Sequence, residues 1–381
     1  MRSFEDDDAR ADTRPPSGAP SRPVPTTSPA DHAADVKPGR ITGIDLARCL
    51  AIVGLFAVHV GPTDADGPLG ALYRLPHGRA SLLFVIVAGV GVTLLAGSSH
   101  TSPMEARSKL AWRAVLLLPL GLALQELDHG AAVILQDYAL LFVVAMVLLA
   151  LPDRGLLGLA AVALPLGSIG FLWGRLNEPD RFTRESVALS DAGVDIVHRL
   201  VLSGPYPLIT WLAPFVLGMW LGRRDLRSRS VRRHLLGWGT AVAVGTFGLS
   251  RLLREVLGVT GEPTGWDHLV MDTPHSQMPL WVIGSTASAA AVLGAALFVA
   301  DAYPRASQPL VFAGQLALTV YVGHLVVLHL APTALTSDEV VPAIALLGSF
   351  ALVSVVVATL WRRVFPQGPL EAVLHLPWRR A

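Results

Sequence analysis

The fold is decided by one stretch of the sequence, Gly43-Ile-Asp45-Leu-Ala-Arg48-Cys-Leu-Ala-Ile-Val-Gly-Leu-Phe-Ala-Val-His59. It belongs to an apolar run over residues 42–60, and about 20 mainly apolar residues suffice for a helix to cross a bilayer. Polar backbone groups in hydrocarbon must bond within their own segment, so we expect a transmembrane helix here. Three ionisable side chains interrupt the run: Asp45, Arg48 and His59.

Similar apolar runs recur along the chain, which has 381 residues. Hydrophobic residues make up 52% and charged residues 15%, whereas soluble proteins carry about 25% charged residues. The alternation of period two that marks a membrane barrel is absent. The sequence therefore predicts an all-α, polytopic integral membrane helix bundle with about ten transmembrane helices. The expected spans are 42–60, 79–97, 108–126, 137–151, 155–174, 207–222, 234–257, 279–300, 309–331 and 340–361.

The two ends of the chain differ from its apolar middle. Residues 1–40 are rich in Pro, Ser, Asp and Ala, so we expect a disordered tail before a bundle at 41–365. Residues 366–381 are predicted to form an amphipathic segment on the membrane surface. Arginine-rich loops, above all Arg223 to Arg233, fall on the same side as both termini. The positive-inside rule then places that side, with the N- and C-termini, in the cytoplasm and the chain in the plasma (inner) membrane.

Composition also excludes several classes of function. The net charge of +1 provides no basic field for nucleic acid, which is therefore not an expected partner. Cys49 is the single cysteine, so no intrachain disulfide can form. Metal-ligating residues show no HExxH motif and no convergent spacing, and neither a metal nor a bound cofactor is expected. The sequence leaves the oligomeric state open.

The ionisable residues of the first span carry the sharpest functional signal. Asp45, Arg48 and His59 are spaced i, i+3 and i+14, which places them on nearly one helix face. Arg48 and His59 lie about 16 Å apart along the axis, the arginine toward the cytoplasm and the histidine toward the outside. Ionisable groups inside a membrane are costly and favour a functional interpretation. The alternative is an Asp45–Arg48 pair at the interface and a histidine that reaches back to it.

These motifs resemble those of transmembrane acyltransferases. The Arg-x10-His pattern of Arg48 and His59 resembles the acyltransferase type 3 family. A wider pattern is similar to bacterial relatives of heparan-alpha-glucosaminide N-acetyltransferase: Gly43-Ile-Asp45-Leu-Ala-Arg48 and Gly78-Arg79-Ala80-Ser81. The C-terminal half resembles the YeiB-like membrane family in two places: Ala313-Gly-Gln315-Leu-Ala-Leu-Thr319-Val-Tyr321-Val-Gly-His324 and Gly368-Pro-Leu-Glu371. The likeness covers residues 41 to about 375.

The resemblance implies acyl transfer across the membrane. An acyl group, acetyl in the simplest case, would pass from cytoplasmic acyl-CoA, a co-substrate, to a sugar or envelope glycan on the outer side. The expected partners are therefore the bilayer, acyl-CoA and that acceptor. His59 matches the family's catalytic histidine and could act as a general base or carry the acyl group itself. Arg48 would suit a CoA phosphate.

Further residues complete the candidate site. His77 and Arg79 open the second span at the outer level, and Asp272 and His275 lie in the loop before the eighth. The candidate catalytic residues are His59, Asp45 and His275. The candidate substrate- and CoA-binding residues are Arg48, Arg79, His77, Asp272, Tyr321 and His324. The alternatives are an interfacial anchor for Arg79, a turn capped by Asp272 and a buried core histidine for His324.

Two other functions remain open at this point, a transporter for a small polar solute and a membrane-anchored assembly protein. The enzyme hypothesis requires Arg48, His59, Arg79 and His275 to line one continuous cavity. The transporter hypothesis requires polar groups to meet near the midplane between two related bundles, but no internal repeat is evident. The polar residues of 125–138 form an outer loop that could hydrogen-bond a polyhydroxylated acceptor, and the alternative interpretation is a solvated loop.

Overall fold

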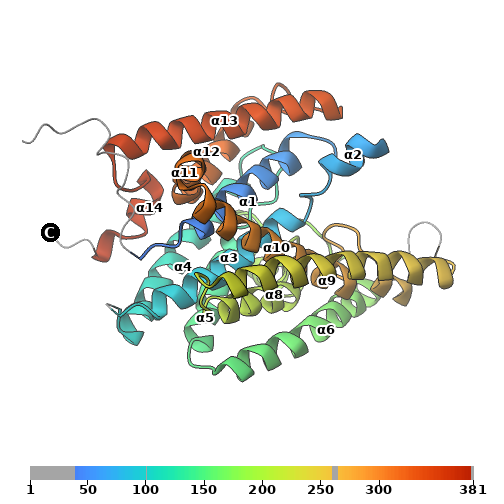
Figure 1. Ribbon diagram of the computed structural model, residues 1–381. Coiled ribbons are helices and arrows are strands. Elements are labelled where there is room, and N and C mark those ends of the chain that lie inside the picture. The colour runs from blue at the N-terminus through green and yellow to red at the C-terminus, as the bar shows by residue number, and fades with distance from the viewer. Residues whose placement is uncertain (1–38, 100, 260–264, 379–381) are drawn as a thin grey trace, which may run out of the picture. The chain divides into compact units, whose positions relative to one another are not determined.

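All regular secondary structure is helical, without strands, in the residues that a computed structural model describes, 39–99, 101–259 and 265–378. The all-α prediction is confirmed. The predicted tail 1–40 lies outside the described residues except for its last two positions. The helices, drawn in Figure 1, are α1 (Thr42–Val60), α2 (Gly67–Tyr73), α3 (Arg79–Ala96), α4 (Pro103–Gln125), α5 (Leu135–Leu148), α6 (Asp153–Asn177), α7 (Gly193–Val201), α8 (Leu208–Leu221), α9 (Arg229–Val256), η2 (Trp266–Val270), α10 (Pro279–Ala302), α11 (Pro304–Gln315), α12 (Ala317–Leu330), α13 (Val340–Val364), α14 (Pro369–Val373) and η3 (Leu376–Trp378).

A helix occupies each of the ten predicted positions, but fewer than ten are long and apolar enough to cross a membrane. In the described part of the chain, five helices meet both conditions, and the bent pair α11–α12 makes a sixth if it counts as one span. Helices α5 and α8 have 14 residues each, a length of about 21 Å against a hydrocarbon core of about 30 Å. Helices α4 and α9 carry several charged side chains. The apolar helices are compatible with a multi-pass membrane protein.

The bundle is built around α1, which packs against α3, α10, α11 and α13. Figure 1 shows α13 at the edge of this group. The most apolar stretch of α1 is 67% buried, whereas that of α13, with a mean hydropathy of 2.5, is only 6% buried. An apolar helix so little covered by protein is stable where hydrocarbon surrounds it, so the outer face of α13 fits contact with lipid.

The ninth predicted span is divided into α11 and α12, which meet at an angle of 68°. Leu316 leaves the helical conformation between them, with φ −99° and ψ 28°. The backbone N–H groups of Leu318 and Thr319, exposed by the break, donate to Oε1 of Glu371 at 2.7 and 3.1 Å. The Thr319 hydroxyl donates to the other carboxylate oxygen at 2.6 Å. Hydropathy is continuous through Leu316, so composition alone does not reveal the bend.

The predicted amphipathic C-terminal segment contains α14 and η3. It folds back against α4, where Nε1 of Trp112 donates to the carbonyl of Val373 at 3.2 Å. Gly368 precedes α14 because a Cβ at this position would collide with the Glu371 carboxylate. The segment thereby lies beside the start of α12, next to the cavity described below.

Candidate functional site

The first turn of α1 holds the predicted Asp45–Arg48 pair. Nη1 of Arg48 donates to Oδ1 of Asp45 at 2.6 Å, and the aspartate is 1% exposed. Gly314 of α11 lies directly over the Asp45 backbone, leaving no space for a Cβ. Two motifs more than 250 residues apart therefore meet here, Gly43–Arg48 and Ala313–His324.

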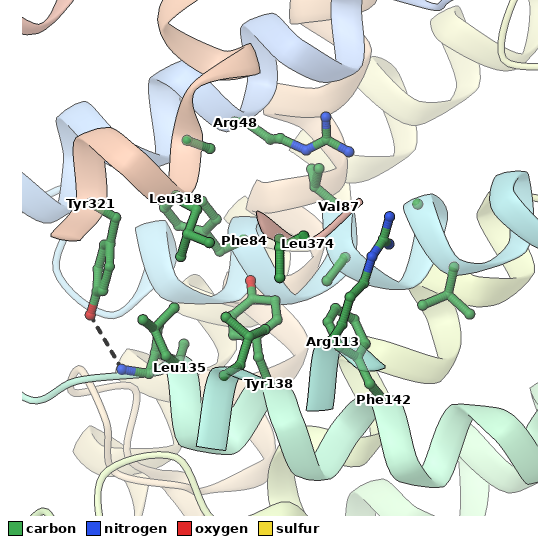
Figure 2. Close-up of a pocket in the computed structure, with 16 residues that line it drawn as sticks. Arg48, Phe84, Val87, Arg113, Leu135, Tyr138, Phe142, Leu318, Tyr321 and Leu374 are labelled. Atoms are coloured by element: carbon green, nitrogen blue, oxygen red, sulfur yellow. Dashed lines mark hydrogen bonds between the residues drawn. The ribbon is translucent and has the colours of Figure 1, made fainter. Parts of the chain in front are cut away.

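Arg48 extends into a cavity of about 190 Å³ between α1, α3, α4, α5, α12 and α14. Figure 2 shows its guanidinium on the same side of the cavity as that of Arg113 from α4. These two residues are the arginine end of the cavity. Most other lining side chains are apolar: Phe84, Val87, Ala88, Val92, Leu117, Ile134, Leu135, Phe142, Ala317, Leu318 and Leu374.

Sequence reasoning missed Arg113. Its Nε is buried and has no hydrogen-bond partner among the described residues. The signal was present, because Arg113 stands inside the predicted span 108–126, where a charged side chain favours a functional interpretation.

Two tyrosines also line the cavity, and Figure 2 shows Tyr321 on the side away from the arginine end, with Tyr138 between Tyr321 and Arg113. The hydroxyl of Tyr321 accepts a hydrogen bond from the backbone N–H of Ile134 at 3.3 Å. The buried hydroxyl of Tyr138 has no partner in the described part of the chain. Tyr321 also contacts His324 one turn later, with ring centroids 5.1 Å apart. Tyr321 therefore connects the cavity with the histidines beyond it.

His59 and His324 form a hydrogen-bonded pair. Nδ1 of His59 lies 3.0 Å from Nε2 of His324, and the rings are parallel to within 4° at a centroid distance of 5.3 Å. His324 is 4% exposed and His59 is half-buried. The sequence placed both residues in the site without predicting that they touch.

His129, His77 and His275 lie near this pair, within electrostatic reach of His59. Both ring nitrogens of His77 are buried without a partner in the described residues, and burial, with the Arg74 charge, lowers its pKa. Burial, with the Arg184 charge, lowers the pKa of His275 from 6.5 to about 4. His59, His77, His275 and His324 are called the histidine cluster below.

His275 is held in a strained turn. Its φ is +56°, a value that non-glycine residues rarely adopt. Its ring packs among Tyr206, Trp211 and Trp281, at centroid distances of 5.6, 6.1 and 5.5 Å. Gln277, also at positive φ, accepts hydrogen bonds from Thr210 and Trp211. Such strain persists only where the surroundings over-determine it, which makes this turn part of the site rather than a mobile loop.

Arg79 and Asp272 do not line the cavity. The Arg79 guanidinium lies 4.5 Å from the centroid of the Phe247 ring and donates to the Leu75 carbonyl at 2.8 Å. Asp272 is within electrostatic reach of Arg79. The geometry of Arg79 is that of an anchor at the start of α3, the alternative that the sequence left open.

The continuous cavity required by the enzyme hypothesis is only partly present. Of the predicted site residues, the cavity includes Arg48 and Tyr321, whereas His59, Arg79 and His275 lie outside it. The interpretation of 125–138 as a solvated loop is wrong at more than one place, because His129, Gln136 and Asp137 are all buried. Gln136 and Asp137 belong to the first turn of α5 and directly precede its apolar run.

The comparison with known proteins bears on the C-terminal part of the chain. No curated protein matches the sequence. The heparan-alpha-glucosaminide N-acetyltransferase relationship of the N-terminal half therefore stays a prediction. Residues 223–380 match the family model described as "Protein of unknown function (DUF418)", a YeiB-like family, and this confirms the C-terminal resemblance that the motifs at 313–324 and 368–371 indicated.

Proposed function

We propose that this protein is an integral membrane acyltransferase that moves an acyl group, acetyl in the simplest case, from acyl-CoA to a sugar or envelope glycan. One observation carries the proposal. Tyr321 joins a cavity that holds two arginines to a hydrogen-bonded histidine pair. The two arginines, which can bind an anion, and the histidine pair, which can move protons, thus lie on either side of Tyr321.

The arginine end fits the phosphates of the donor. Guanidinium groups bind phosphate through paired, charge-assisted hydrogen bonds. Arg48 is held in place by Asp45, and Nε of Arg113 is unused among the described residues. The apolar remainder of the cavity suits the uncharged acyl-thioester arm. The arginine-rich loops favour a cytoplasmic position for this end, the side on which acyl-CoA is made available.

The histidine cluster fits the acceptor step. As the acceptor oxygen or nitrogen attacks the thioester carbonyl, His59 takes the proton that the acceptor loses. The carbon–sulfur bond then breaks, and the proton passes to the departing CoA thiolate. General-base assistance of this kind is worth about 10²–10⁴-fold in rate. Transfer through an acyl-histidine uses the same residue as nucleophile, with the acyl group on His59 before it reaches the acceptor.

A transporter is the second candidate, and the break between α11 and α12 favours it. Discontinuous helices form substrate sites in many transporters, where the exposed helix N-terminus binds an anionic group. In this chain, however, the N-terminus of α12 already binds the carboxylate of Glu371. The enzyme proposal gives the arginine end and the histidine cluster roles in one reaction.

Acetyl-CoA binding and turnover in detergent test the proposal, with glucosamine as the acceptor probe. His59→Ala should abolish CoA release while donor binding persists. Arg48→Ala and Arg113→Ala should each weaken donor binding by about 10–100-fold, the loss expected for one charge-assisted contact of about 1.5–3 kcal/mol.

Arg251→Ala and His329→Ala provide matched controls. Arg251 is exposed on α9, and His329 bonds to the backbone of Asp128 at the far end of α12, so both variants should behave as wild type. A folded wild-type protein that neither binds nor consumes acetyl-CoA would contradict acyl transfer and favour the transporter.

A further inference from the structure

The contact between His59 and His324 defines which nitrogen of each ring is engaged. Nδ1 of His59 meets Nε2 of His324 at 3.0 Å. A single proton occupies this contact when both rings are neutral, because one nitrogen must donate and the other accept. Two arrangements are therefore open, and they leave the other nitrogen of His59, Nε2, either bare or protonated.

The surroundings of His324 favour one of these arrangements. The carbonyls of Val320 and Tyr321, one turn earlier in α12, lie within electrostatic reach of the imidazole. Carbonyl oxygens only accept hydrogen bonds, so they favour a proton on Nδ1, the nitrogen nearer the backbone, although no well-aligned bond forms there. Nε2 of His324 is then bare and accepts from Nδ1–H of His59.

Packing leaves His324 no freedom to serve a substrate. Its ring is enclosed by Phe56 and Tyr321 at centroid distances of 4.9 and 5.1 Å, and His59 meets its edge through the hydrogen bond. It does not line the cavity. The role predicted from the sequence, substrate or CoA binding, does not fit a side chain that is 4% exposed and held by three rings.

We propose that His324 is a positioning residue for His59, accepting its Nδ1–H and leaving its Nε2 lone pair free to act on the acceptor. An acceptor on one ring nitrogen fixes the tautomer and orientation of an imidazole and makes the other nitrogen more basic. The positive charge that His59 gains with the acceptor proton is then shared along the hydrogen bond to His324. The catalytic meaning of the pair rests on the proposed acyl transfer, whereas the hydrogen bond itself does not.

Two substitutions separate positioning from packing. His324→Phe keeps an aromatic ring between Phe56 and Tyr321 but removes the acceptor. His324→Gln restores an acceptor oxygen in place of Nε2. His329→Phe, on the same helix outside the cluster, is the control for a general effect of phenylalanine. Thermal unfolding and size-exclusion chromatography establish that each variant is folded.

The first measurement does not depend on enzyme activity. Diethylpyrocarbonate acylates unprotonated histidine nitrogen, and mass spectrometry follows its rate at His59. We expect the rate at His59 to fall several-fold in His324→Phe, to recover at least in part in His324→Gln and to be unchanged in His329→Phe. Equal rates at His59 in wild type and folded His324→Phe would overturn the proposal, whether or not the protein is an acyltransferase.

The second measurement separates positioning from donor binding. In His324→Phe, kcat for CoA release from acetyl-CoA should fall by at least about tenfold, part of the general-base contribution of about 10²–10⁴, while KM for acetyl-CoA stays unchanged. His324→Gln should regain part of that loss. A rise in KM at constant kcat would instead make His324 a donor-binding residue and overturn the inference. Absence of any turnover in wild type contradicts the proposed function alone, since the modification rate still decides on the hydrogen bond.

Discussion

The two ends of α1 carry different chemistry in different surroundings. At Arg48 the helix borders a cavity that a second arginine shares. At His59, about 16 Å further along the axis, other rings fill the space, and the cavity does not reach the side chain. Arginine keeps its charge at any physiological pH, whereas histidine changes charge near neutrality. The arginine end should therefore respond to changes in shape and charge, and the histidine cluster to changes in pH.

The largest expected loss of stability comes from forcing α1 and α11 apart at the arginine end of the cavity. Gly314→Leu places a side chain against the backbone of Asp45, where not even a Cβ fits. Backbone cannot yield as a flexible side chain does, so we expect a loss of more than about 3 kcal/mol, at or beyond the upper range for overpacking. The measurement is the yield of monodisperse protein and its thermal unfolding in detergent.

Gly323→Leu is the matched control for this substitution. Gly323 belongs to α12, the next helix, and a Cβ there meets nothing within 4 Å. The variant should fold and unfold as wild type does. If Gly314→Leu were equally stable, the contact between the two motifs would not organise the arginine end.

A smaller loss of stability is expected when the carboxylate that caps α12, that of Glu371, loses its charge. Glu371→Gln keeps an oxygen that can accept from Leu318 and Thr319 but removes the negative charge at the helix N-terminus. We expect a loss of about 1 kcal/mol, typical of a helix cap. Glu178→Gln, which weakens an exposed pair with Arg181, should lose about 0.3–0.5 kcal/mol. Equal losses in the two variants would show that the cap does not stabilise the bend.

The sequence was sufficient for features that depend on period and composition. The first span ends at the predicted residues, 42 and 60, because its apolar run has no competing signal. The spacing of Arg48 and His59 also predicted their common helix and their separation. Order along the chain identified four motifs, and three of them contact another part of the site in the structure: Gly314 lies on Asp45, His324 on His59, and Glu371 on Thr319.

Features that depend on tertiary contacts escaped prediction. The bend at Leu316 depends on a carboxylate that lies 55 residues later, and hydropathy carries no trace of it. Asp137 was included in the predicted polar loop 125–138, but the packing of α5 buries it. Arg79 had the right position for a pocket residue, yet Phe247 and the Leu75 carbonyl bind its guanidinium. Residue type and position therefore predicted the composition of the site better than its contacts.

The last effect, visible only below neutral pH, sharpens the contrast between the two ends. Because burial and the Arg184 charge lower the pKa of His275 to about 4, the folded state binds fewer protons than the unfolded state between about pH 4 and 6.5. Stability from this residue is therefore complete above pH 6.5 and is lost as the pH falls toward 4.

Wild type should lose a few degrees of thermal stability across this window, and His275→Phe should lose less, because its ring does not titrate. His234→Phe, at an exposed position of α9, should follow wild type. If the thermal stability of wild type and of His275→Phe changed with pH in parallel, the strained turn would tolerate a charged imidazole. The two ends of α1 would then differ in shape but not in their response to pH.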